Sequence, residues 1–172
     1  MPIYSFDDGE YRRRVHANGR SADQVFGPVE VLFRRFPKEF LVNGWPVPLN
    51  IPFDATGISV NRSKYSIPDD VLEPDCCGGN IRSGQVVLEF LVDDLPAELP
   101  EDDPKYRFAL KHDPRECCYA HSVIWCNIDG DIGSPCLKPS KTVRDLFRAQ
   151  LLIRMQEAGR VPREITPLAS AG

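Results

Sequence analysis

The sequence lacks a long apolar segment. No uninterrupted apolar run approaches the roughly 18 residues that a membrane-spanning helix requires. The first residues, Met1–Asp8, also lack the basic and apolar regions of a secretory leader. These two absences predict a soluble cytoplasmic protein that has no membrane partner.

An excess of positive charge is missing as well. The chain has 21 Lys and Arg against 25 Asp and Glu, a formal net charge of −4, so no global field attracts nucleic acid. It contains no P-loop, no glycine-rich dinucleotide motif after a strand, and no Gly-x-Ser-x-Gly elbow. No cofactor is therefore predicted, and the candidates for proton transfer narrow to the histidines, of which there are three.

The six cysteines lack the CxxC spacing of zinc knuckles and redox motifs. They occur as two adjacent pairs and two single residues: Cys76, Cys77, Cys117, Cys118, Cys126 and Cys136. In a chain without an export signal we expect them to be reduced, because the cytosol keeps thiols reduced. No metal site is predicted; the alternative is a zinc-stabilised module in which Cys117, Cys118, His112 and His121 bind the metal.

Short strand-like segments dominate the rest of the chain. Sixteen prolines against twelve glycines favour many short elements. Residues 29–36 fit a helix or a strand equally well, and Asn43-Gly44 is typical of a tight hairpin turn. Further strands are expected at residues 57–61, 106–112 and 121–128, and the apolar run 85–92 at a central position.

One helix is predicted near the C-terminus. Ser140 is a good N-cap, apolar residues recur at helical spacing from Val143 to Leu151, and Gly159 is placed to end the helix. The sequence thus predicts an α+β fold, a mainly antiparallel sheet of six or seven short strands with a C-terminal amphipathic helix packed on it. We expect a single domain over residues 1–160 and a flexible tail over residues 161–172.

The two histidines at the ends of neighbouring strand segments are the most informative feature. Side chains alternate between the faces of a strand, so His112 shares a face with Phe108 and Leu110. By the same rule His121 shares a face with Val123 and Trp125. If residues 106–112 and 121–128 pair as a hairpin, the two imidazoles lie near each other at one end of the sheet.

These histidines suggest a catalytic hypothesis. Metal-independent phosphodiester cleavage needs a base, an acid and cationic groups near the phosphate, and histidine suits both proton roles. Arg62 and Lys64 could supply the charge, and Tyr65 a further hydrogen bond. A ribonuclease or phosphotransfer enzyme that uses His112 and His121 is therefore one interpretation of the sequence.

The leading interpretation is a non-catalytic interaction module. The segment Trp45–Leu49 has prolines at alternate positions and an aromatic residue, as an exposed recognition edge would have. Two basic clusters would admit nucleic acid as a local patch: Arg12, Arg13 and Arg14, and then Arg34 and Arg35. We expect the chain to bind another macromolecule, a protein first of all, as a component of a larger system, and the sequence gives no indication of oligomeric state.

Overall fold

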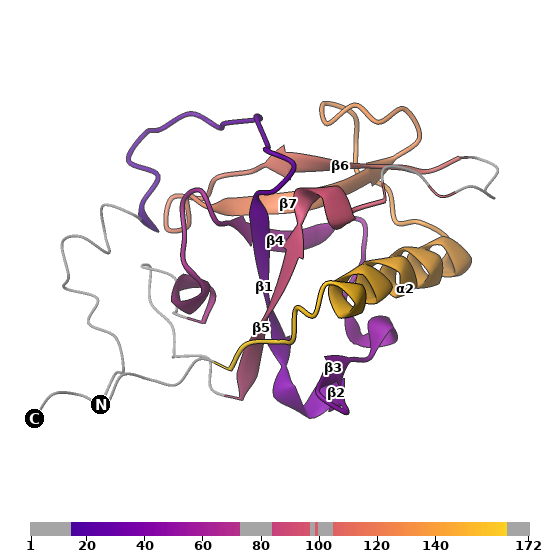
Figure 1. Cartoon of the computed structure of the whole chain (residues 1–172). Coiled ribbons are helices and arrows are strands. Elements are labelled where there is room, and N and C mark those ends of the chain that lie inside the picture. The colour runs from indigo at the N-terminus through magenta and orange to yellow at the C-terminus, as the bar shows by residue number, and fades with distance from the viewer. Residues whose placement is uncertain (1–14, 73–83, 97–98, 100–104, 165–172) are drawn as a thin grey trace, which may run out of the picture.

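The computed structural model describes residues 15–72, 84–96, 99 and 105–164 (Figure 1). These ranges contain no helix with the length and apolar character that crossing a membrane would require. The basic cluster Arg12–Arg14, Cys76, Cys77, most of the expected loop at 73–84 and residues 165–172 of the expected tail lie outside the described residues.

The expected α+β architecture is confirmed. The main sheet is entirely antiparallel and has the strand order β5-β1-β4-β7-β6. Its strands are β1 (Val31–Pro37), β4 (Ile58–Arg62), β5 (Gln85–Leu91), β6 (Arg107–His112) and β7 (His121–Asn127). The segment that the sequence left open between helix and strand is thus a strand, and the two histidine segments pair directly.

A small hairpin lies beside the main sheet (Figure 1). Strands β2 (Leu41–Val42) and β3 (Trp45–Pro46) pair around Asn43 and Gly44, which both have the positive φ that this turn needs. Short 3-10 turns connect the strands: η1 (Lys38–Phe40), η2 (Pro48–Asn50), η3 (Pro68–Val71) and η4 (Val92–Asp94).

Helix α2 (Lys141–Glu157) begins and ends as expected. The Ser140 hydroxyl accepts a hydrogen bond from the backbone N–H of Val143, and Gly159 has a positive φ after the last turn. Figure 1 shows α2 running beside β5 and the β2–β3 hairpin. Its apolar stripe is fully buried and forms the core with one face of the sheet: Val143, Phe147, Leu151 and Met155.

Strand β5 corrects one expectation. Its buried valines and leucine predicted a central strand, but β5 is the last strand on one side of the sheet. The backbone N–H and C=O of Val87 bond instead to Arg163, so the chain after α2 covers this edge. Both faces of β5 are buried because Val86, Leu88 and Phe90 pack in the main core and Val87 packs with Phe33, Val71 and Leu72 on the other face. The bonds to Arg163 protect the backbone groups of the edge as a neighbouring strand would.

In the part of the chain that the structure describes, the cysteines differ in whether they form a disulfide. Cys118, Cys126 and Cys136 are reduced thiols, as expected, whereas Cys117 is disulfide-bonded. The expectation of reduced cysteines therefore does not hold at Cys117. A disulfide requires two cysteine side chains to lie close together in space, and the redox state of the cytosol does not predict which side chains do so.

Candidate functional site

The pocket between β1 and β4 is a local failure of strand pairing. The two strands pair only at Leu32 with Arg62 and at Phe33 with Asn61, whereas β1 pairs with β5 along seven residues. Beyond Phe33 they diverge, and Arg34 Nη1 donates a hydrogen bond to the backbone oxygen of Ser59 at 2.6 Å. The Arg34 guanidinium thus bonds to a β4 carbonyl that a backbone N–H of β1 would bond if the strands stayed paired. A cavity opens beside it.

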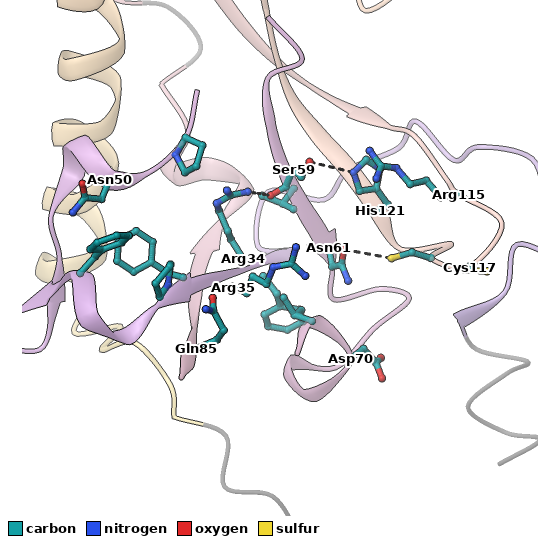
Figure 2. Close-up of a pocket in the computed structure, with 18 residues that line it drawn as sticks. Arg34, Arg35, Asn50, Ser59, Asn61, Asp70, Gln85, Arg115, Cys117 and His121 are labelled. Carbon is teal, nitrogen blue, oxygen red and sulfur yellow. Dashed lines mark hydrogen bonds between the residues drawn. The ribbon is translucent and has the colours of Figure 1, made fainter. Parts of the chain in front are cut away.

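This cavity, the β1–β4 pocket, has a volume of about 540 Å³. Its walls come from β1, β4, η3 and the turn that leads into β7 (Figure 2). Its lining combines the aromatic rings of Phe33, Phe36 and Phe40 with polar and cationic side chains: Arg34, Arg35, Arg115, Ser59, Asn61 and His121.

Arg34 has an incomplete set of partners. Its Nε is buried and has no hydrogen-bond partner, and no carboxylate of the described residues forms an ion pair with its guanidinium. Burial, together with the charge of Arg35, lowers the pKa of Arg34 to about 10. The site therefore holds a desolvated cation whose charge is not neutralised by direct contact.

The pocket holds more positive charge than negative. Arg35 and Arg115 line it together with Arg34, and Asp70 is the carboxylate among its lining residues. Asp70 Oδ2 accepts the backbone N–H of Ile67 and so caps η3. The excess of guanidinium groups favours an anionic ligand.

His121 lies in this pocket with a defined orientation. Its Nδ1 lies 2.7 Å from the backbone oxygen of Asp113, which can only accept, so Nδ1 carries the proton in the neutral ring. Its Nε2 lies 3.3 Å from Ser59 Oγ. Burial is the main cause that lowers the pKa of His121; the Asp113 hydrogen bond opposes it and the charge of Arg115 adds to it.

Arg62 lies on the opposite face of β4 from Ser59 and Asn61. It is fully buried, and its Nε and Nη2 donate to the carboxylate of Glu30, at 2.7 and 2.9 Å. Its Nη1 and Nη2 also donate to the backbone oxygens of Asp23 and Val25. Arg62 thereby ties the segment of residues 23–30 onto the end of the sheet.

His112 belongs to the same network as Arg62. It pairs in register with Ser122, so it points to the face opposite to that of His121. Its Nδ1 accepts the backbone N–H of Asp23, and its Nε2 lies 2.6 Å from the backbone oxygen of Tyr119. Burial lowers the pKa of His112, and both ring nitrogens are already bonded within the protein.

Lys64, Tyr65 and Trp45 also lie away from the pocket lining. Lys64 Nζ and the Tyr65 hydroxyl both bond to Asp23 Oδ2, at 2.7 and 2.6 Å, and the Tyr65 ring stacks on His112. Trp45 is half-buried against the main core. The structure thus brings His112, Arg62, Lys64 and Tyr65 together, and it places Arg34, Arg35 and His121 together elsewhere.

The zinc alternative finds no ligand set in the described ranges. No group of three or more His, Cys, Asp or Glu side chains converges there. His112 and His121 diverge because consecutive cross-strand positions face opposite ways, so they do not meet around one ion.

Sequence reasoning missed Ser59, Asp113 and Arg115 as members of the site. The alternation of β4 could have separated Ser59 and Asn61 from Arg62, since side chains two apart share a face. The backbone oxygen of Asp113 carries no sequence signal at all.

Comparisons of the chain with protein-family models, curated proteins and solved structures find no match.

Proposed function

We propose that this protein is a binding component that recognises a phosphate group on a partner protein, with the β1–β4 pocket as the receptor. The observation that carries the proposal is Arg34, a partly buried guanidinium with an unpaired Nε and no direct counter-ion. A bound phosphate would supply the missing acceptor and the missing charge. Arg35 and Arg115 extend the cationic surface around it.

Arginine is well matched to this ligand. Its planar fork of N–H groups fits two oxygens of a phosphate at once, and such charge-assisted bonds are stronger than neutral ones. One Arg34 nitrogen is held by Ser59 O, which fixes the side chain before any ligand arrives. Binding then costs little side-chain entropy.

The aromatic part of the lining favours a phosphate attached to a ring or an aliphatic chain. Phe33, Phe36 and Phe40 line the pocket together with the arginines, and about 540 Å³ is more than a bare phosphate ion fills. Phosphorylated side chains of a protein partner have this combination of charge and apolar surface. The proposal keeps the expected protein–protein role and moves it from the Trp45 edge to this pocket.

The test is calorimetric titration with phenyl phosphate, with phenol as the neutral ligand of the same ring. We expect phenyl phosphate to bind and phenol to bind far more weakly. Arg34→Met should weaken phenyl phosphate binding by about tenfold to hundredfold, the range for one charge-assisted hydrogen bond.

Arg154→Gln is the matched control. Arg154 is an exposed arginine on α2 that does not line the pocket and bonds to the backbone oxygen of Asp93. It should bind phenyl phosphate like the wild type. Equal weakening in both variants, or equal affinity for phenyl phosphate and phenol, would contradict a built phosphate site.

A further inference from the structure

Ser59, His121 and Asp113 form a linear relay in the β1–β4 pocket. Ser59 is exposed on β4, and its Oγ lies 3.3 Å from Nε2 of the buried His121. The opposite ring nitrogen, Nδ1, is held by Asp113 O at 2.7 Å, and the Asp113 carboxylate lies 3.5 Å from the same atom. Figure 2 shows the His121 ring directed toward Ser59, with Arg115 beside the ring and the Arg34 guanidinium next to Ser59.

We propose that Ser59 is a nucleophile activated by His121, and that the pocket transfers the phosphoryl group of a phosphate monoester to Ser59 and then to water. This inference rests on the proposed phosphate site. It assigns a chemical role to the two groups that recognition alone does not need.

The hydrogen bonds fix the direction of proton transfer. Asp113 O can only accept, so the Nδ1 proton stays on that side and the Nε2 lone pair faces the Ser59 hydroxyl. Burial favours the neutral ring, which is the form that can take a proton. A serine hydroxyl is a weak nucleophile until such a base removes its proton.

The arginines supply the second requirement. Phosphoryl transfer spreads negative charge over three equatorial oxygens, and fixed cations around them stabilise the transition state. Arg34 reaches the backbone of Ser59 itself, so its guanidinium lies beside the attacking residue. Arg115 flanks His121 closely enough to affect the pKa of the imidazole.

The reaction balances in two steps. In the first, the Ser59 proton passes to His121 Nε2, the Oγ–P bond forms, and the bond from phosphorus to the leaving oxygen breaks; the imidazolium proton reaches the leaving oxygen through solvent. In the second, His121 takes a proton from water, the water oxygen attacks phosphorus, and the P–Oγ bond breaks. The imidazolium then returns a proton to Ser59, and inorganic phosphate leaves.

The test uses p-nitrophenyl phosphate with the full chain, with p-nitrophenolate release and the mass of acid-quenched protein as readouts. We expect slow release and a phosphoryl group on Ser59. Ser59→Ala should lose both and still bind phenyl phosphate within about threefold of the wild type. His121→Gln should lower the rate by about 10²- to 10⁴-fold, the usual contribution of a general base.

Ser122→Ala is the control for serine loss. Ser122 follows His121 in the chain but is buried on the opposite face of β7, so its loss should leave release and labelling unchanged. Phenyl phosphate binding without release and without a Ser59 adduct would overturn this inference and leave the phosphate-recognition proposal standing. Absence of phenyl phosphate binding would overturn the recognition proposal, and release without a Ser59 adduct would overturn the nucleophile assignment alone.

Discussion

Two arginines on one sheet, the fully buried Arg62 and the partly buried Arg34, differ in how their charge is balanced. Arg62, at the end of β4, has a carboxylate of Glu30 and two backbone oxygens as partners. Arg34, on β1, has one backbone oxygen, an unpaired Nε and no direct counter-ion in the described chain. A buried polar group that is fully bonded is part of the fold, whereas one left open costs stability and calls for a different explanation.

The two histidines repeat this contrast. Both nitrogens of His112 bond to backbone groups, and its ring is enclosed by Tyr65 and Tyr119. His121 has one nitrogen fixed by the backbone, and the other faces an exposed serine in a pocket. The satisfied groups therefore hold the structure together, and the open groups are the place to look for chemistry.

The largest expected effect is on Arg62. Arg62→Met leaves the nearly buried Glu30 carboxylate without its cation and removes donors from the backbone oxygens of Asp23 and Val25. Breaking a buried pair in this way costs about 3–5 kcal/mol. Urea unfolding, followed by far-ultraviolet circular dichroism, should show the lower midpoint.

Replacing Arg34 by Met should change the free energy of unfolding in the opposite direction. Arg34→Met removes a desolvated cation and an unpaired donor, so we expect the free energy of unfolding to rise by about 1 kcal/mol. The same urea titration measures it. Similar losses for Arg62→Met and Arg34→Met would show that Arg34 is as structural as Arg62.

Protonation of the two histidines should also change the stability of the fold. Burial lowers the pKa of both His112 and His121, so the unfolded chain takes up protons near pH 6.5 while the folded chain does not. Stability is therefore fully present above this pH and falls as the pH drops through the window below it. Urea midpoints measured from pH 8 to pH 5 should show that decline.

A bound phosphate should separate the two histidines. An anion in the β1–β4 pocket favours the imidazolium form, so phenyl phosphate should raise the pKa of His121 toward its usual value. The pKa of His112, on the other face, should stay unchanged. NMR titration of the ring protons with and without phenyl phosphate measures both, and a shift at His112 alone would place the ligand on the wrong face.

Features of the fold and the site were predictable from the sequence where residues close together in the chain determine them. The Asn43-Gly44 turn and the Ser140 cap are set by their own residues, and both were predicted. The pairing of residues 106–112 with 121–128 also followed from their alternation and proximity in sequence. The eight-residue connection left the register open, and it is the register of His112 with Ser122 that sends the imidazoles to opposite faces.

The pocket had no local signal. Nothing in residues 31–37 or 58–62 indicates that β1 and β4 pair at only two positions, because pairing between strands far apart in the sequence depends on tertiary packing. The edge position of β5 was missed for a similar reason. Apolar residues on both faces of a strand indicate that both faces are covered, but they do not indicate whether another strand or the chain near Arg163 bonds to its edge.

The smallest effect is expected at Lys64, the exposed member of the satisfied network. Its ammonium lies 2.7 Å from Asp23 Oδ2, but its side chain is half exposed and Tyr65 donates to the same oxygen. Lys64→Met should therefore lower the urea midpoint at pH 7 only slightly, since exposed ion pairs are screened by water and salt. A loss comparable to that of Arg62→Met would mean that the network acts as one cooperative unit.

Acid titration of this variant shows what Lys64 does instead. Its hydrogen bond is the largest cause that holds the pKa of Asp23 well below its usual range, ahead of the bond from Tyr65. A depressed carboxyl pKa adds stability that is present above about pH 4 and is lost as the pH falls below it. Lys64→Met brings the pKa of Asp23 closer to its unfolded value, so stability should decline less between pH 4 and pH 2 than in the wild type. An unchanged acid profile would assign the low pKa of Asp23 to Tyr65 and the backbone, and would leave Lys64 as a solvated surface charge.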